Sequence, residues 1–254
     1  MWSLERHKKI IALLNERQRL TTEMFAAELG VSRETVRRDL IELEQMGRLS
    51  RVHGGAVPSQ GLPEASYVER SRLHKAEKQA IARAAAPLLV RGSTCFIDAG
   101  STTHALAREL AGREDIQVIT NSVDVAAALG RTSGLEVLLL GGRMESDVPA
   151  TYGEQTVAEI SRHRVDMALI SPVSLDAEHG AMDYVWHEAT VARAMLHNAR
   201  TRVLLVDANK LGVSSRVQIC GCNEIDVLVT DAQASQAQLQ ALRDAGVREI
   251  VQAR

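Results

Sequence analysis

The spacing of apolar residues near the start of the chain predicts two short helices. Leu and Ile recur every three or four positions over residues 4–14, which is typical of one face of a helix that ends near Asn15. Thr21 or Thr22 can cap a second helix, which stops at Gly30 because glycine tolerates the left-handed conformation of a tight turn.

The following residues predict a third helix and a hairpin. Ser32 can cap the helix, and its apolar residues fall on one stripe, formed by Val36, Leu40 and Leu43. Residues 48–57 look like two short strands that turn at Gly54 and Gly55, a pair that favours a tight hairpin. Two helices, a tight turn, a third helix and a hairpin are the elements of a winged helix-turn-helix domain.

The rest of the chain alternates strand-like and helix-like segments. The apolar, strand-like runs are residues 94–98, 116–120, 135–140, 165–170, 202–207, 225–230 and 248–252. Between them, the helical stretches are residues 74–90, 103–110, 123–129, 152–160, 188–199 and 234–245. Because the strands are continuous runs of Val, Ile and Leu, we expect an α/β fold with a mostly parallel sheet that helices cover on both faces.

Prolines, a glycine and small polar residues interrupt the periodicity between these two parts, as in linkers. We therefore predict a winged helix-turn-helix domain over residues 1–57, a linker over 58–73 and a second domain over 74–254. Residues 1–56 carry 10 Lys and Arg against 8 Asp and Glu, whereas the remainder carries 20 against 24. The two parts therefore differ in the sign of their net charge, +2 against -4.

Composition excludes several classes of protein. With 254 residues, 45% of them hydrophobic, and a net charge of -2, the chain is neither disordered nor collagen-like. Its three cysteines, Cys95, Cys220 and Cys222, are too few for a disulfide scaffold, and Cys95 fits a buried strand. We found no run of about 18 apolar residues, so we expect a cytoplasmic protein without a membrane partner.

One face of the third predicted helix can enter the major groove of DNA. Arginine bonds guanine edges there in bidentate fashion, and Ser or Thr hydroxyls hold phosphates. The candidate DNA-binding residues are Ser32, Arg33, Thr35, Arg37 and Arg38 on the helix, with Arg51 and His53 on the hairpin. The alternative is a solvated face, on which these arginines pair with Glu34, Asp39, Glu42 and Glu44.

Polar residues follow several strands of the second domain. Residues 98–103, with the sequence DAGSTT, lie at a strand-to-helix turn that offers backbone N–H groups to a phosphate, although they also suit a plain helix cap. Asn121, the pair Gly141 and Gly142, and Lys210 follow other strands, at the edge where ligands of open α/β sheets bind. Lys78 is interpreted as a solvated lysine that could also reach this site.

Both parts of the chain resemble the DeoR family of bacterial repressors. Arg6, Ile10 and Leu14, the segment SxxTVRRDL over residues 32–40, and RVHGGA over residues 51–56 are similar to its helix-turn-helix signature. The turns described above, DxGSTT, TNS, GGR and D-x-N-K, look like its effector domain, whose fold is similar to ribose-5-phosphate isomerase. The resemblance extends from about Leu4 to Asp231.

This resemblance implies a repressor of a sugar or polyol catabolic operon that forms a homo-oligomer, dimer or tetramer, and is released from operator DNA by a phosphorylated sugar or polyol. It implies no cofactor. The implied effector-binding residues are Asp98, Gly100, Ser101, Thr102, Thr103, Asn121, Gly141, Gly142, His187, Glu188 and Lys210. Residues 207–212 read DANKLG where the family usually has DSSKFG, so Lys210 is retained while a hydroxyl and an aromatic ring are lost.

Tyr184, His187 and Glu188 form a Tyr-x-x-His-Glu run similar to one in repressors that respond to glycerol 3-phosphate, which favours small polyol phosphates. Two other interpretations of His187 and Glu188 stay open: they can simply begin a helix, or bind a metal, although Val191 breaks the HExxH pattern. A sugar-phosphate isomerase or hydrolase, with Asp98, Glu188 or Asp207 as general base, and a transcriptional activator are the alternative functions.

Overall fold

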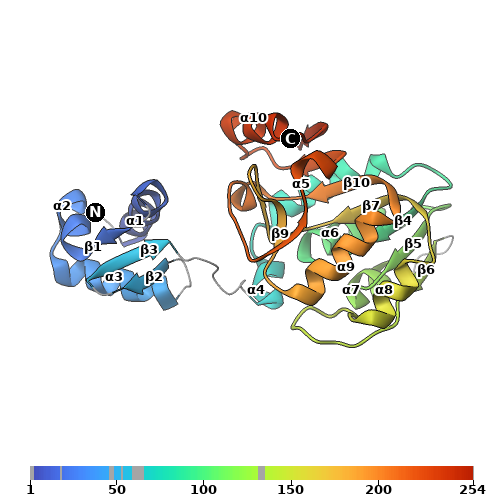
Figure 1. The fold of residues 1–254 in the computed structure, drawn as a ribbon, viewed down its shortest axis with the longest axis horizontal. Coiled ribbons are helices and arrows are strands. Elements are labelled where there is room, and N and C mark those ends of the chain that lie inside the picture. Colours follow the sequence, from blue (N-terminus) through green and yellow to red (C-terminus); the bar gives the residue numbers. More distant parts are fainter. Residues whose placement is uncertain are drawn as a thin grey trace. The chain divides into compact units, whose positions relative to one another are not determined.

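The computed structural model describes residues 3–17, 19–45, 49–52, 54–58, 66–130 and 135–253. It divides into two compact units, Met1–Glu64 and Ala65–Arg254, each with its own hydrophobic core (Figure 1). The predicted linker overlaps both units. Its residues 67–72 form a helix, α4 (Tyr67–Arg72), and its residues 59–65 lie outside the described part of the chain.

The first unit is the predicted winged helix-turn-helix domain. Its elements are α1 (Ser3–Arg17), β1 (Leu20–Thr21), α2 (Thr22–Leu29), α3 (Arg33–Gln45), β2 (Leu49–Val52) and β3 (Gly55–Pro58). The Thr21 hydroxyl caps α2 by accepting from the Met24 N–H at 3.2 Å, and Gly30 ends it with a φ of 64°. The Ser32 hydroxyl caps α3 by accepting from the Thr35 N–H at 3.1 Å. These caps set the tight turn between α2 and α3.

The strands of this unit differ from the prediction in two ways. The short β1 pairs with β3, giving a three-stranded antiparallel sheet of order β1-β3-β2, because a strand of two residues leaves no pattern in a sequence. Val52 pairs with Gly55, so Gly55 belongs to β3 and not to the turn as predicted. A Cβ on Gly55 would lie 2.1 Å from the Leu20 carbonyl oxygen, so glycine allows β1 to approach β3.

The predicted apolar stripe of α3 is buried in a core shared by all three helices and the sheet. That core consists of Ile10, Leu14, Leu20, Phe25, Leu29, Val36, Leu40, Leu43, Leu49 and Ala56. A domain of this size buries little apolar surface in total, so each large side chain carries a substantial share of its stability. Phe25 is 0% exposed and is the one aromatic ring of this cluster among the described residues.

Replacing Phe25 with alanine is therefore expected to unfold the first unit. Deleting a buried Phe costs about 3–5 kcal/mol, which is comparable to the whole stability of a domain of about 60 residues. Calorimetry on the full chain should lose the transition of the first unit and keep that of the second. The neighbouring Met24→Ala, at a side chain that is 43% exposed, is the control and should melt like the wild type. A Phe25→Ala chain with both transitions unchanged would contradict this assignment of the core.

The second unit is built on a seven-stranded sheet in which all neighbouring strands are parallel, which confirms the predicted α/β class. The strands are β4 (Thr94–Ile97), β5 (Gln117–Thr120), β6 (Glu136–Leu139), β7 (Val165–Ile170), β10 (Ala199–Leu205), β12 (Val227–Thr230) and β13 (Glu249–Gln252). Their order is β13-β12-β10-β7-β4-β5-β6. Successive strands run outward from β4 on one side and from β7 on the other, so the order reverses between β4 and β7.

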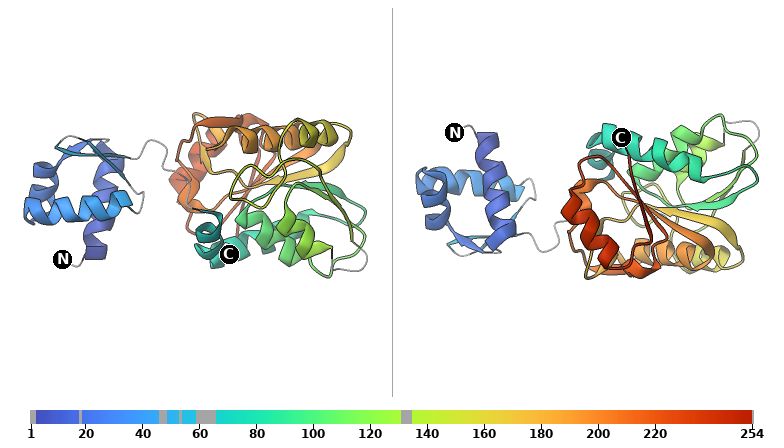
Figure 2. Two further views of the ribbon diagram at one scale, coloured as in Figure 1. Left: turned by 90° about the horizontal axis from the view of Figure 1, so that it is seen from below. Right: turned by 90° about the horizontal axis from the view of Figure 1, so that it is seen from above.

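Helices cover both faces of this sheet (Figure 2). One core contains side chains of α5 (Lys75–Ala85), η1 (Ala86–Leu88), α6 (Ser101–Leu110) and α7 (Val123–Leu129). The other contains side chains of α8 (Glu154–Ile160), α9 (Trp186–His197) and α10 (Gln236–Asp244). Of the helices in the described part of the chain, none has both the length and the apolar character that a membrane span requires.

A second, smaller sheet was not predicted. Antiparallel strands β8 (Ser174–Asp176), β9 (Gly180–Asp183) and β11 (Val217–Cys220) have the order β11-β9-β8. Two short 3₁₀ turns, η2 (Ala208–Lys210) and η3 (Cys222–Glu224), complete the unit. In the chain, β8 and β9 directly follow β7, the strand at which the order of the main sheet reverses. Open α/β sheets bind ligands at such a reversal.

Candidate functional sites

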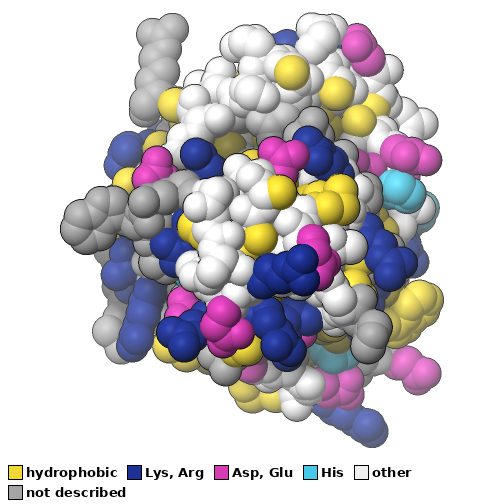
Figure 3. Space-filling model, turned by 90° about the vertical axis from the view of Figure 1, so that its left-hand side faces the viewer, with side chains coloured by type: hydrophobic (Ala, Val, Ile, Leu, Met, Phe, Trp, Pro, Cys, Tyr) yellow, Lys and Arg dark blue, Asp and Glu magenta, His cyan; other side chains and the backbone are white. Residues whose placement is uncertain are grey.

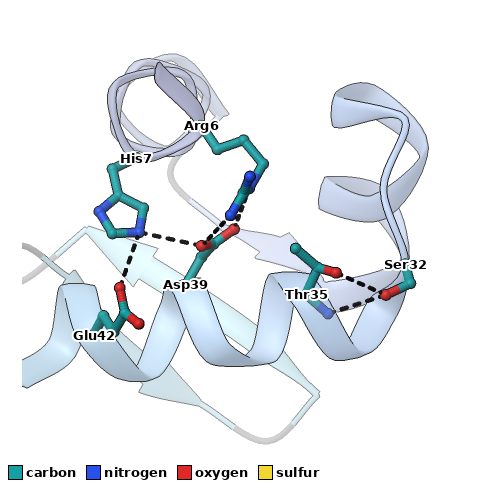
Figure 4. Close-up of polar contacts among 6 residues, drawn as sticks. All are labelled: Arg6, His7, Ser32, Thr35, Asp39 and Glu42. Atoms are coloured by element: carbon teal, nitrogen blue, oxygen red, sulfur yellow. Dashed lines mark hydrogen bonds and ion pairs between the residues drawn. The ribbon is translucent and has the colours of Figure 1, made fainter. Parts of the chain in front are cut away.

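An ion pair between α1 and α3 fixes the helix that carries most of the candidate DNA-binding residues (Figure 4). Asp39 is 3% exposed, and its carboxylate accepts from Arg6 Nε at 2.7 Å and Nη2 at 2.9 Å. His7 Nε2 lies 3.2 Å from the same carboxylate and 3.6 Å from Glu42. The alternative interpretation placed Asp39 on a solvated face, and for this residue it was wrong. The Arg6 guanidinium on Asp39 also disfavours a metal ion among His7, Asp39 and Glu42.

The arginines on the outer face of α3 are held only by exposed ion pairs. Arg33 lies 3.1 Å from Glu23, and Arg38 lies 3.7 Å from Glu34, with both arginine side chains at least 70% exposed. Arg37 is exposed and makes no hydrogen bond or ion pair with the described residues. Surface pairs of this kind contribute about 0–1 kcal/mol and are easily exchanged for a phosphate or a base. On the face drawn in Figure 3, Lys and Arg side chains lie interspersed with Asp and Glu side chains.

The hairpin residue Arg51 is already engaged. Its N–H donates to Glu44 Oε1 at 3.0 Å and its Nε to Oε2 at 2.6 Å, which ties the wing to the end of α3. These hydrogen bonds lower the pKa of Glu44. His53 lies outside the described residues. Ser32 and Thr35 share a hydrogen bond of 2.9 Å between their hydroxyls at the helix cap, so they shape the start of α3.

In the second unit, loops after three neighbouring strands meet at the carboxyl edge of the sheet. Asp98 follows β4, and its Oδ2 accepts from the N–H of Ser171, which follows β7, at 3.0 Å. Lys210, after β10, donates from Nζ to the Pro172 carbonyl at 2.9 Å. Asp98 and Lys210 therefore lie at the same edge, at the point where the strand order reverses.

A small polar cavity opens at this point. It is lined by Arg70, Asp98, Ala99, Asn121, Tyr152, Ser171, Val173, Asp183, Glu188, Val191 and Ala192. Among the described residues, Oδ1 of Asp98 and Oδ1 of Asn121 are buried without a hydrogen-bond partner. Unsatisfied buried acceptors are rare in native proteins, and the hydroxyl groups of a bound polyol would satisfy both.

Burial changes the charge of the cavity wall. It raises the pKa of Asp98 to about 7, against the hydrogen bond from the Ser171 N–H and the nearby charge of Lys210. It also raises the pKa of Asp183, against the N–H groups of Val185 and Tyr184 and the charge of Lys210. The carboxyls of the cavity therefore carry less negative charge near neutral pH than their number suggests.

Several predicted effector residues lie beside the cavity instead of lining it. The Gly141 N–H donates to Glu159 at 3.0 Å, and its carbonyl accepts from the Thr156 hydroxyl at 2.7 Å, so this turn packs on α8. A Cβ on Gly142, whose φ is 151°, would lie 2.2 Å from the Thr156 hydroxyl. These glycines permit close packing, and the Gly141 N–H is not available to a phosphate.

The segment after β4 also serves the fold. Gly100 is extended and packs on Ser171, while Thr102 and Thr103 are 1% and 0% exposed. The Thr103 hydroxyl donates to the Gly100 carbonyl at 3.0 Å. Ser101 begins α6 and lines a wider groove formed with α4 and α5. Of DAGSTT, Asp98 and Ala99 are the residues that line the cavity.

The Tyr-x-x-His-Glu run contributes one side chain to the cavity, Glu188. The His187 ring meets the Tyr152 ring edge to face, with centroids 4.7 Å apart, and its Nδ1 lies 3.8 Å from Glu145. The Tyr184 ring lies under the Arg216 guanidinium at 4.2 Å. His187 and Glu188 are in the first turn of α9, as the helix-start interpretation predicts, and Glu188 also lines the cavity.

The interpretation of Lys78 as a solvated lysine was wrong. Lys78 is 6% exposed and donates from Nζ to the carbonyls of Arg70 and Leu73 at the end of α4. Three further residues that line the cavity were not predicted from the sequence: Arg70, Tyr152 and Asp183. Arg70 was assigned to the linker, and Asp183 belongs to β9, a strand that no alternating pattern indicated.

The whole length of the chain matches known proteins. Residues 6–60 match the model of the DeoR-like helix-turn-helix domain, and residues 73–232 match that of the DeoR C terminal sensor domain. The chain belongs to the DeoR family. It is 37% identical to the HTH-type transcriptional repressor GlcR of Bacillus subtilis (strain 168), over 99% of this chain and 97% of that protein.

Two other relatives are also named as repressors. The chain is 33% identical to the glycerol-3-phosphate regulon repressor of Haemophilus influenzae, over 89% and 88% of the two chains, and 31% identical to that of Escherichia coli (strain K12), over 96% and 97%. Ribose 5-phosphate isomerase A of Methanocaldococcus jannaschii is similar in structure with a TM-score of 0.40, at 19% identity over 52% of each chain. At that level the match says nothing about what this DeoR-family chain binds.

The raised pKa of Asp98 predicts how this DeoR-family sensor responds to pH. An unfolded Asp98 loses its proton as the pH rises past 3.8, whereas the folded one keeps it to about 7. The folded state therefore loses stability over that window. Asp98→Asn should gain about 2–4 kcal/mol relative to the wild type between pH 4 and pH 8. Urea unfolding of the second unit at both pH values measures this, with the exposed Asp244→Asn as control. A constant difference would contradict the prediction.

Proposed function

We propose that this chain is a transcriptional repressor of a sugar or polyol catabolic operon. Its first unit binds operator DNA through α3 and the wing, and its second unit binds a phosphorylated sugar or polyol that releases the operator. The names of the relatives, repressors that include two glycerol-3-phosphate regulon repressors, support the class of function. The single observation that carries the effector part is the cavity at the strand-order reversal, with its two buried acceptors beside Lys210.

The geometry favours a small effector. The cavity supplies acceptors for hydroxyl groups from Asp98 and Asn121, and Lys210 supplies a positive charge for an anion. Tyr152 and Val191 close part of the wall with apolar surface. This combination of hydroxyl acceptors, cationic groups and limited space fits a phosphorylated polyol of a few carbons better than a large sugar.

Operator binding requires more than one copy of this chain. One recognition helix reads few base pairs, so we propose that the second units associate and that two α3 helices bind half-sites about one helical turn, or a multiple of it, apart. Analytical ultracentrifugation with and without operator DNA distinguishes a dimer from a tetramer. A monomer that binds a single half-site with full specificity would contradict this part of the proposal.

A gel-shift experiment tests the function directly. The full chain is bound to the promoter fragment beside its own gene, and glycerol 3-phosphate, a pentose 5-phosphate and a hexose 6-phosphate are then titrated in. We expect one of these to release the DNA, and the same compound to raise the melting temperature. Unphosphorylated glycerol is the control. A chain that none of the phosphates releases or stabilises would contradict the effector assignment.

The enzyme alternative is tested in the same samples. The repressor proposal expects the compound that binds to be recovered unchanged, whereas an isomerase or hydrolase would convert it at a measurable rate. A reporter gene under the same promoter then separates a repressor from an activator, because deleting the chain raises expression in the first case and lowers it in the second.

A further inference from the structure

The short helix α4 lies between the two regions that match family models, since the first match ends at residue 60 and the second begins at residue 73. It also directly follows the segment that leads from the helix-turn-helix domain. Even so, it contributes the half-buried Arg70 to the wall of the effector cavity, together with Asp98, Asn121 and Glu188. A residue of the supposed linker is thus a part of the sensor site.

Arg70 is the only cationic side chain in the lining of that cavity as the described residues define it. Its charge acts on Asp183, where it opposes the rise in pKa that burial causes. Lys210 acts on the same carboxyl and on Asp98. Two cations from distant parts of the sequence therefore act on Asp183, and Lys210 acts on Asp98 as well.

A guanidinium and an ammonium group have different uses beside a phosphate. The planar guanidinium presents two parallel N–H donors that match two phosphate oxygens, whereas lysine acts as a point charge. The cavity carboxyls would repel a phosphate if they were fully ionised. Burial raises the pKa of Asp98 to about 7 and raises that of Asp183, which reduces this repulsion near neutral pH.

Contacts at both ends hold α4 on the second unit. At its start, the Tyr67 N–H donates to Asp147 at 2.6 Å and the Tyr67 hydroxyl to Asp124 at 2.7 Å. At its end, the buried Lys78 donates to the carbonyls of Arg70 and Leu73, the latter at 3.0 Å. These contacts fix the six-residue helix on the second unit, so Arg70 is held close in sequence to the start of that unit at Ala65.

We propose that Arg70 binds the phosphate group of the effector, and that α4 thereby links effector binding to the chain segment that leads to the helix-turn-helix domain. This inference rests on the proposed function. An effector shifts the DNA-binding equilibrium only if it binds two conformational states of the protein with different affinity. An effector that binds Arg70 creates this difference at α4, which is the helix of the second unit nearest to the DNA-binding domain in the sequence.

Arg70→Gln, Arg70→Lys and Arg72→Gln test the proposal in the full chain. Arg72 is on the same helix, but it is exposed and lines the outer groove instead of the cavity. Calorimetry uses the phosphate that binds the wild type most tightly among glycerol 3-phosphate, a pentose 5-phosphate and a hexose 6-phosphate. We expect Arg70→Gln to weaken effector binding about tenfold or more. The affinity of Arg70→Lys should lie between those of Arg70→Gln and the wild type, and the affinity of Arg72→Gln should stay within about twofold of the wild type.

Operator release is the second measurement, and it should need a correspondingly higher effector concentration for Arg70→Gln alone. Melting of each variant without effector checks that it is folded, and Arg70→Lys serves if Arg70→Gln is not. A wild-type dissociation constant and release midpoint in Arg70→Gln would overturn the role of Arg70 and leave the proposed function standing. A wild type that binds none of the three phosphates would overturn both.

Discussion

Replacing Arg37 with alanine is expected to weaken operator binding about tenfold to a hundredfold without unfolding the protein. Arg37 lies on the exposed face of α3 and makes no hydrogen bond or ion pair with the described residues, so its guanidinium is available to DNA. A bidentate contact from arginine to a guanine contributes about 1–3 kcal/mol of discrimination. Gel shifts with operator and with a scrambled fragment at matched salt measure both affinity and specificity.

Two variants make this result specific to the recognition helix. Arg91→Ala removes the same charge from an 85% exposed side chain of the second unit and should leave operator affinity unchanged. Arg51→Ala should weaken binding less than Arg37→Ala, because the Arg51 guanidinium is already bonded to Glu44. Equal operator affinities for Arg37→Ala and the wild type would contradict the assignment of α3 as the helix that reads the bases.

The sequence predicted the first unit well because its signals are local. Caps at Thr21 and Ser32 and the left-handed Gly30 act within three or four residues, so they can be identified without any knowledge of the fold. The role of Asp39 could not be found in this way, because its partner Arg6 is 33 residues distant. The same carboxylate looked like one more solvent-exposed partner for the arginines of α3.

The parallel sheet was predictable for a different reason. Strands that are buried on both faces read as unbroken apolar runs, and each of the seven predicted runs overlaps one strand of the main sheet, although β10 begins three residues before its predicted run. The small sheet of β8, β9 and β11 carries short, mixed segments, and its pairing of β9 with β11 spans more than 30 residues. Only the folded chain brings these strands together.

The effector site shows the limit of predicting a ligand site from turns. Asp98, Asn121 and Lys210 each follow a predicted strand, and from this they were correctly predicted to lie at one edge of the sheet. The carboxyl ends of parallel strands meet at the same edge. The sequence could not show that the Gly141 N–H is already taken by Glu159, or that α4 turns Arg70 toward the same cavity. Such facts depend on which helix packs above each loop.

Replacing Lys210 with methionine is expected to leave operator binding intact and to raise the effector concentration needed for release by about tenfold to a hundredfold. The ammonium group is the positive charge that acts on both Asp98 and Asp183, and it lies at the strand-order reversal where the loops after β7 and β10 meet. A charge-assisted hydrogen bond to a phosphate contributes about 1.5–3 kcal/mol, which methionine cannot replace. Gel shifts with increasing effector give the release midpoint.

Lys210 also donates to the Pro172 carbonyl, so its loss could act through the loop instead of through the ligand. Lys210→Arg separates the two causes, because it restores a cation and a donor and should recover most of the response to effector. Lys75→Met, at an exposed position on α5, removes the same charge away from the cavity and should respond like the wild type. If Lys210→Met released the operator at the wild-type effector concentration, the anion would have to bind elsewhere, and the convergence of these loops would serve only the fold.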